Sequence, residues 1–255
     1  MKVFGFWYWI MVFDFFKRGF SGYVNQDFVD YADFFMASSF FLDTLPRSGV
    51  VIVKVMGAKF VLKNYSRRIK PWRRGKLNKL KCRVRNEIHW LLKLESLAVG
   101  SPGLVLYVER EGVFGFDAIA LMSVVEGRPI DLFEGNDLLV AAKHGVQAIA
   151  KLHLLGVAHG DCNLHNFIIS DDVSPIDFEW AGVLCEQSAS YDLEKFLGRL
   201  RQRDSSLNLD QVVESYLQVS PFPCFDPRKV LDKVRTSAIV EVKDKWRPLQ
   251  EFEVF

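Results

Sequence analysis

The spacing of apolar and polar residues predicts a β-rich first half of the chain. β-branched residues in "VVIVKV", a turn at residues 56–58 and the following "KFVLK" predict a β-hairpin with strands near residues 50–55 and 59–63. "NEIHWLLKLESLAVG" then places apolar residues at helical spacing and ends at Gly100, which predicts a helix. "LVLYVERE" and "DAIALMSVVEG" predict two further strands that meet at a glycine-containing turn.

The pattern becomes helical after Asn136. Leu139, Val146 and Ile149 fall on one face of a predicted helix, with Asn136 as its N-cap and Gly156 as its stop. "SYDLEKFLGRLRQR" and "DQVVESYLQV" are amphipathic helices, and the last thirty residues, mixed and charged, also predict helix. The chain is therefore predicted to be α+β, with an aromatic-rich segment over residues 1–41, a small and mainly antiparallel β lobe over 42–127, and a mainly helical lobe over 128–255.

Composition indicates a folded protein of a reducing compartment. Residues of apolar type make up 49% of the 255 residues, which allows a sizeable core and excludes a disordered chain. The four cysteines have no paired spacing, which is typical of reduced thiols and predicts a cytoplasmic location. The net charge is only +2, but ten Lys or Arg lie between Arg67 and Arg85 with no acid among them.

The N-terminus is apolar and aromatic from Val3 to Phe13. This run is too short to cross a bilayer, which needs roughly 20 apolar residues. It follows Lys2 as a signal peptide would, but no small-residue cleavage site comes after it, so we expect it in the mature protein. Two interpretations stay open: an interfacial membrane anchor rich in Trp, Tyr and Phe, or an apolar segment packed on the first lobe.

The densest polar chemistry lies in "HGDCNLHNFIISDDVSPID", residues 159–177. If "FII" and "PI" pair as an antiparallel hairpin, Asn166 before the first strand and Asp177 after the second lie at the same open end. An amide oxygen and a carboxylate there form a hard oxygen site of the kind that Mg²⁺ prefers. Asp161 opens the same loop and is placed to accept a proton from an incoming hydroxyl.

This arrangement, H-x-D-x-x-x-x-N followed by an Asp, is the one used in kinase-type phosphoryl transfer. The other expected parts occur in the right order upstream. Lys63, at the end of a predicted strand, is placed to pair with phosphates, and Glu87, on the predicted helix, is placed to hold that lysine. Ser123 and Val125, in "LMSVVEGRPI", are predicted to bind adenine through backbone groups at a hinge, with ATP and Mg²⁺ between the lobes. Downstream, Asp192 is predicted to brace the backbone of the loop.

Three other interpretations are open at this stage. His159, Cys162 and His165 are possible zinc ligands, although no fourth ligand lies nearby in the sequence. The kinase-like order of residues can also arise by chance. Finally, a pseudokinase would bind nucleotide without catalysis, although every side chain that the chemistry requires is present.

"HGDCNLHNFII" and "IDFEWAG" resemble the small sugar and aminoglycoside kinases of the protein-kinase-like superfamily, and among them the lipopolysaccharide core kinases, including the heptose and Kdo kinases. The similarity covers roughly residues 50–203. It implies a two-lobed protein-kinase-like fold and an ATP-dependent kinase of lipopolysaccharide inner-core sugars at the cytoplasmic face of the inner membrane. It also implies these roles: Asp161 the base, Asn166 and Asp177 the Mg²⁺ ligands, Lys63 the phosphate lysine and Glu87 its partner. "IDFEWAG" is also similar to the choline and ethanolamine kinases, so a kinase of the choline or aminoglycoside type is the alternative.

Two departures from the protein-kinase pattern bear on the substrate. No G-x-G-x-x-G precedes Lys63, and only about a dozen residues separate Asp177 from Tyr191, too few for a segment that binds peptides. Protein substrates are therefore not expected. The basic tract from Arg67 to Arg85 favours an anionic partner, either membrane headgroups or a phosphorylated glycolipid, and argues against a cationic acceptor. No nucleic acid partner is expected, because no helix-turn-helix pattern accompanies the tract.

Overall fold

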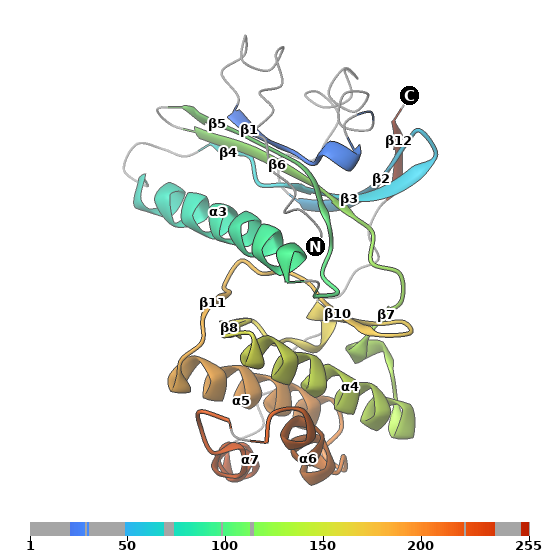
Figure 1. Cartoon of the computed structure of the whole chain (residues 1–255), viewed down its shortest axis with the longest axis vertical. Coiled ribbons are helices and arrows are strands. Elements are labelled where there is room, and N and C mark those ends of the chain that lie inside the picture. Colours follow the sequence, from blue (N-terminus) through green and yellow to red (C-terminus); the bar gives the residue numbers. More distant parts are fainter. Residues whose placement is uncertain are drawn as a thin grey trace, which may run out of the picture. The chain divides into compact units, whose positions relative to one another are not determined.

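Figure 1 shows the computed structural model of the chain, in which two compact units are distinguished. The structure describes residues 21–28, 30, 49–68, 74–97, 99–112, 115–221, 223–237 and 251–254. The first unit holds the described residues of Met1–Val84, Gly103–Val124 and Pro248–Phe255, and the second holds those of Arg85–Pro102 and Val125–Arg247. The sequence analysis divided the chain into segments 1–41, 42–127 and 128–255; in the structure, the chain passes from one unit to the other more than once.

The first unit is built on one sheet, which has seven strands in the described part of the chain. Its order is β1-β5-β6-β3-β2-β12, and β4 pairs with β6 beside this path. The strands are β1 (Ser21–Val24), β2 (Gly49–Val55), β3 (Ala58–Asn64), β4 (Arg67–Arg68), β5 (Leu104–Gly112), β6 (Gly115–Ser123) and β12 (Glu251–Val254). Neighbours are antiparallel except for β12, which runs parallel to β2. The predicted antiparallel β lobe is therefore confirmed.

The predicted hairpin consists of β2 and β3, joined by a two-residue turn. Met56 and Gly57 have φ angles of 50° and 82°, the left-handed values that a tight hairpin turn requires at both central positions. Ala58, which the sequence placed in the turn, already pairs with Val55 in the sheet. Along β2 the buried residues alternate with partly exposed ones, so one face of the sheet forms the core of this unit.

Helix α3 (Arg74–Ser96) is longer at its start than the sequence predicted. The predicted helix began at Asn86 and ended at Gly100, but the structure begins it inside the basic tract and ends it four residues earlier. Leu77, Val84 and Leu91 are buried along this helix at seven-residue spacing. That stripe was hidden among lysines and arginines, which are themselves good helix formers.

The second unit is mainly helical, as predicted. It contains η4 (Ile130–Leu132), α4 (Gly135–Leu154), α5 (Glu186–Arg203), α6 (Leu209–Val219) and α7 (Pro227–Thr236). Helix α4 packs on α5 and α6, and α7 packs on both α5 and α6 (Figure 1). Their facing side chains, among them Ile149, Phe196 and Tyr216, are fully buried and form one hydrophobic core.

Two details of the predicted helices are wrong. The N-cap of α4 is Glu134 rather than Asn136, so the helix starts two residues earlier than predicted, at Gly135, which has a φ of 54°. The last thirty residues are not all helix: α7 covers ten of them, and β12 is a strand. The alternating sequence "EFEV" has the two-residue period of a strand, which the surrounding charges obscured. The predicted stop at Gly156, with φ of 73°, is confirmed.

Short strands of the second unit carry the polar loop. β8 (Val157–Ala158) pairs with β11 (Gly182–Val183), and β9 (Phe167–Ile169) pairs antiparallel with both β7 (Arg128–Pro129) and β10 (Val173–Pro175). The 3₁₀ turn η5 (Leu164–Asn166) leads into β9. The hairpin predicted from "FII" and "PI" is confirmed, although its second strand begins earlier, at Val173, which pairs with Ile169.

The aromatic segment over residues 3–13 and part of the basic tract, residues 69–73, lie outside the described residues. Within the described ranges, none of the helices combines the length and the apolar character that crossing a bilayer demands.

Candidate active site

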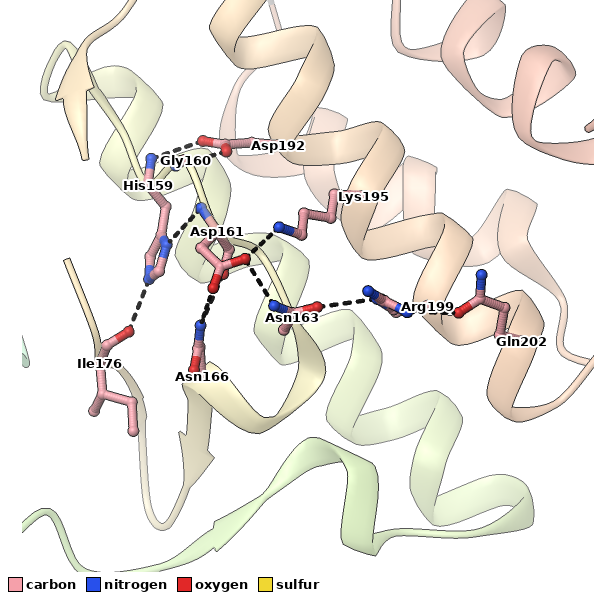
Figure 2. A network of polar contacts seen from close by, with 10 residues as sticks. All are labelled: His159, Gly160, Asp161, Asn163, Asn166, Ile176, Asp192, Lys195, Arg199 and Gln202. Carbon is pink, nitrogen blue, oxygen red and sulfur yellow. Dashed lines mark hydrogen bonds and ion pairs between the residues drawn. The ribbon is translucent and has the colours of Figure 1, made fainter. Parts of the chain in front are cut away.

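Asp161 and Asn166 meet at the start of the β9–β10 hairpin (Figure 2). The Nδ2 atom of Asn166 donates to the backbone oxygen of Asp161 at 2.9 Å and to its Oδ2 atom at 3.2 Å. Asn166 is only 2% exposed, and its Oδ1 atom accepts no hydrogen bond from the described residues. An amide oxygen that accepts no hydrogen bond from the described residues is a suitable ligand for a hard cation.

Asp177 follows directly after the other end of the same hairpin. The N–H group of Ile176 donates to the backbone oxygen of Asn166 at 2.8 Å, so the pairing that the sequence predicted runs up to the residue before Asp177. Asp177 has a φ of 67°, a left-handed value that is uncommon for residues other than glycine, although Asp adopts it more readily than most, and such residues cluster at active sites. The structure thus brings the two predicted metal ligands to one end of the hairpin.

Two further carboxylates lie beside Asp177. Oxygen atoms of Glu87, Asp177 and Glu179 all lie within 4.8 Å of one another, and Glu87 is 1% exposed. The Nδ2 atom of Asn86 holds this segment against α3, because it donates to the backbone oxygens of Glu179 at 3.1 Å and Ala181 at 2.8 Å. Carboxylate and amide oxygens of this kind fit a hard cation such as Mg²⁺.

Sequence reasoning did not identify Glu179 or Asn86. Glu179 stands two residues after Asp177, and in an extended segment side chains at this spacing point to the same side. The apolar Phe178 between them, which is fully buried, fits that alternation, and this pattern could have identified Glu179. No comparable signal marked Asn86, since its partner Glu179 lies 93 residues away.

Asp192 braces the loop, as predicted. This residue on α5 is fully buried, and its carboxylate accepts hydrogen bonds from the N–H groups of His159 at 2.7 Å and Gly160 at 2.8 Å (Figure 2). His153 approaches the same carboxylate with Nε2 at 3.3 Å, while its Nδ1 atom lies 2.7 Å from the hydroxyl of Tyr216. Burial raises the pKa of that hydroxyl, so Tyr216 stays protonated.

His159 is a structural residue of the loop. Its Nε2 atom lies 3.0 Å from the backbone oxygen of Ile176, and its Nδ1 atom accepts from the N–H group of Asp161 at 3.3 Å. Both ring nitrogens are therefore engaged, which leaves neither for zinc. Burial lowers the pKa of His159, against the opposing charges of Asp192 and Asp177, and this favours the neutral ring. Cys162 is also fully buried, and burial raises the pKa of its thiol.

Helix α5 contacts the loop with two cations as well. Lys195 pairs with Oδ1 of Asp161, and the same oxygen accepts from Nδ2 of Asn163 at 2.7 Å. The Nε atom of Arg199 in turn donates to Oδ1 of Asn163 at 2.9 Å (Figure 2). Burial lowers the pKa of Lys195, but hydrogen bonding and charge from Asp161 outweigh this and leave that pKa above its usual value. The spacing of Asp192, Lys195 and Arg199 on one helix face was the signal that the sequence analysis did not use.

The predicted nucleotide contacts are distributed over both units. Lys63 lies on β3 of the first unit, opposite Val50 and Ala120, whereas Glu87 belongs to the second unit. Ser123, at the end of β6, donates its N–H to the backbone oxygen of Gly103 at 2.9 Å, and Val125 is the first residue after the passage into the second unit. The roles of these four residues stay predictions.

Comparison with solved structures identifies the fold. A crystal structure of aminoglycoside-3′-phosphotransferase of type VIII matches 82% of this chain and 100% of that one, with a TM-score of 0.55 and 14% sequence identity. The chain has a protein-kinase-like fold. A weaker match, with a TM-score of 0.43 and 13% identity, is to the bifunctional kinase-methyltransferase WbdD, over 65% of this chain and 41% of that one.

Sequence comparison gives one partial relative and no family. No family model matches the chain. A probable bifunctional tRNA threonylcarbamoyladenosine biosynthesis protein of Thermoplasma acidophilum is 37% identical over 101 residues, which are 37% of this chain. The chain spans only 17% of that relative's length.

Proposed function

We propose that the protein is an ATP- and Mg²⁺-dependent phosphotransferase with an alcohol group as acceptor. The observation that carries this proposal is the joining of Asp161, Asn166 and Asp177 at one end of a short hairpin, in a chain with a protein-kinase-like fold. Phosphoryl transfer asks little covalent chemistry of the protein. It requires a base, a metal site and fixed geometry, and we assign all three to this loop.

Asp161 is the proposed base. Its Oδ2 atom takes the proton of the acceptor hydroxyl while the hydroxyl oxygen forms a bond to the γ-phosphorus and the bond from that phosphorus to ADP breaks. Asp192 keeps the loop in place through its two backbone hydrogen bonds, so the base does not have to reorganise.

Asn166 and Asp177 are the proposed Mg²⁺ ligands, and Glu87 and Glu179 lie close enough to Asp177 to contribute. Bound Mg²⁺ supplies charge neutralisation at the phosphate oxygens of ATP. Lys63 is proposed to pair with those phosphates and Glu87 to hold that lysine. Because the N–H group of Ser123 is bonded to Gly103, we assign the adenine contacts to the carbonyl of Ser123 and the backbone of Val125.

For the acceptor we propose a sugar hydroxyl of the lipopolysaccharide inner core. The resemblance of "HGDCNLHNFII" to core kinases and the basic tract before residue 85 support this choice. It would place the protein in the cytoplasm, peripherally at the inner membrane. Sedimentation with anionic vesicles at low salt, lost near 1 M salt where the Debye length is about 3 Å, is the expected result. A protein that stays in solution at low salt would contradict the membrane contact.

Two other acceptor classes have specific support. The aminoglycoside kinase with a similar fold favours an aminoglycoside- or choline-type acceptor. The partial relative in tRNA threonylcarbamoyladenosine biosynthesis favours a role for this kinase in that process, at a higher sequence identity but over a shorter stretch. ADP release in the presence of core oligosaccharide, choline, kanamycin or unmodified tRNA separates the three classes, because the true acceptor raises the rate.

The experiment that tests the proposal itself needs no acceptor. We expect Mg²⁺-dependent release of ADP from ATP by the full chain, and loss of that activity in Asp161→Asn. Asp232→Asn, an exposed change on α7, is the matched control and should retain the activity. Thermal stabilisation by ATP and Mg²⁺ without any ADP release would instead identify a pseudokinase.

A further inference from the structure

The two carboxylate oxygens of Asp161 are in different environments. Oδ1 accepts from Nδ2 of Asn163 at 2.7 Å and is paired with the ammonium of Lys195, whereas Oδ2 accepts, from the residues that the structure describes, a single bond, from Asn166 at 3.2 Å. A carboxylate oxygen has two lone pairs, so Oδ1 is saturated and Oδ2 is not. Oδ2 is therefore the oxygen left to receive an incoming hydroxyl, and Figure 2 shows the ammonium of Lys195 beside Oδ1 of the same carboxylate.

Lys195 and Arg199 carry two positive charges, and one carboxylate of the loop, that of Asp161, is paired with them. They are one turn apart on the same face of α5, where like charges repel each other by a few tenths of a kcal/mol. Arg199 donates to Oδ1 of Asn163 and, at 2.9 Å, to Oε1 of Gln202, both neutral amides. Among the described residues, Asp161 is the only carboxylate paired with either cation. A bound anion between Lys195 and Arg199 would balance the second positive charge.

Lys195 is held beside the base by the fold. It lies one turn after the fully buried Asp192, and its side chain is 21% exposed, with the ammonium 5.6 Å from the centre of the Tyr191 ring. Tyr191 itself is 50% exposed. Ligand sites commonly combine aromatic side chains with a few fixed polar or charged groups, and Tyr191 and Lys195 supply one of each beside the proposed base.

We propose that Lys195 and Arg199 form an anion subsite for the acceptor, which selects a sugar that carries a phosphate near the reacting hydroxyl. The inference rests on the proposed kinase function and narrows its substrate class. Phosphate oxygens would accept hydrogen bonds from the ammonium and the guanidinium, which are strong because both partners are charged. A polycationic acceptor would instead bring further positive charge against the pair. The phosphate can belong to a soluble sugar phosphate or to a phosphorylated glycolipid.

The test compares acceptors that differ by one phosphate. ADP release by the full chain with ATP and Mg²⁺ is measured with glucosamine and glucosamine 6-phosphate, with core oligosaccharide before and after phosphatase treatment, and with kanamycin. We expect kcat/KM to be about 10- to 100-fold higher for the phosphorylated member of a pair. A preference in the first pair identifies a soluble sugar phosphate, and a preference in the second identifies a phosphorylated core glycolipid.

Variants connect that preference to the two cations. Lys195→Met and Arg199→Gln should each bring the ratio of kcat/KM within a pair toward one, whereas Lys195→Arg should keep most of it. Lys233→Met is the matched control, because Lys233 of α7 bonds Glu194 of α5 at 2.6 Å, and within the described ranges it has no hydrogen bond to the loop. It should leave the ratio unchanged.

The proposal is overturned if kanamycin or the unphosphorylated sugar is preferred, if Lys195→Met keeps the full ratio, or if none of these acceptors raises an intact basal rate of ATP hydrolysis. A folded wild-type protein that releases no ADP under any of these conditions would refute the kinase function itself, which is a different result.

Discussion

Replacing Asp192 by Asn tests whether this buried carboxylate fixes the catalytic loop. The carboxylate accepts two backbone hydrogen bonds, at 2.7 Å from His159 and 2.8 Å from Gly160, and it is fully buried. An Asn side chain keeps one acceptor oxygen but turns an NH₂ group toward the other N–H, so one bond is lost and a buried donor has no partner. Hydrogen bonds to a charged group contribute about 1.5–3 kcal/mol, and an unsatisfied buried donor costs about 1–3 kcal/mol.

Because these two contributions overlap, we expect Asp192→Asn to lower the free energy of unfolding by about 2–4 kcal/mol. Urea unfolding followed by tryptophan fluorescence should show the midpoint falling by about 1 M or more. ADP release should fall by about 10- to 100-fold, because small displacements of a base are costly. Asp232→Asn, whose carboxylate is 76% exposed, is the control and should change stability by less than about 0.5 kcal/mol.

If Asp192→Asn is as stable and as active as the control, the loop is held by other contacts and the reasoning is refuted. A variant that loses stability but keeps full activity would show that the brace supports the fold without positioning the base.

Three further variants test other parts of the site. Gly160→Ala should lower the free energy of unfolding by more than about 2 kcal/mol, because the φ of Gly160 is 76° and an added Cβ would lie 2.1 Å from the backbone oxygen of Trp180. The control is Gly156→Ala, which has a φ of 73° and no atom within 4 Å of an added Cβ, and it should cost only about 1 kcal/mol. Urea unfolding of both variants measures the difference. Because the pKa of His159 is lowered by burial, the unfolded chain binds a proton below pH 6.5 more readily than the folded chain does. The free energy of unfolding should therefore fall as the pH drops from 6.5, by at most about 1.4 kcal/mol per pH unit, and His159→Gln should flatten that slope. Equal slopes for the two proteins would contradict the neutral, buried state of His159. Lys63→Met should reduce the rate of ADP release by about 100-fold, whereas the control Lys59→Met, on the same strand, should leave that rate unchanged. Equal rates for the two variants would mean that Lys63 does not contact phosphate.

Much of the fold and the centre of the site were predictable because they depend on local sequence. The β2–β3 hairpin follows from a β-branched run and a Met-Gly turn, and the convergence of Asn166 and Asp177 follows from a hairpin of only a few residues. The brace by Asp192 was also predictable, because the order of residues in kinase-type sites includes it.

The parts that the sequence analysis missed depend on contacts between distant segments. Lys195 and Arg199 lie 34 and 36 residues from their partners on the loop, and Asn86 lies 93 residues from Glu179. The spacing of Lys195 and Arg199 from Asp192 places them on the same face of α5, but that spacing alone does not tell which residue of the loop each cation contacts. The start of α3 was missed for a different reason, since a run of basic residues outweighed a sparse apolar stripe.

The most direct test of the central claim is ADP release by Asp177→Asn. The structure places this carboxylate within 4.8 Å of those of Glu87 and Glu179, at the end of the hairpin that carries Asn166, and we assign it to Mg²⁺. We predict that the folded variant loses at least about 100-fold in Mg²⁺-dependent ADP release, because a metal that neutralises phosphate charge contributes several kcal/mol to the transition state. Near-normal turnover by a well-folded Asp177→Asn protein would contradict the kinase assignment.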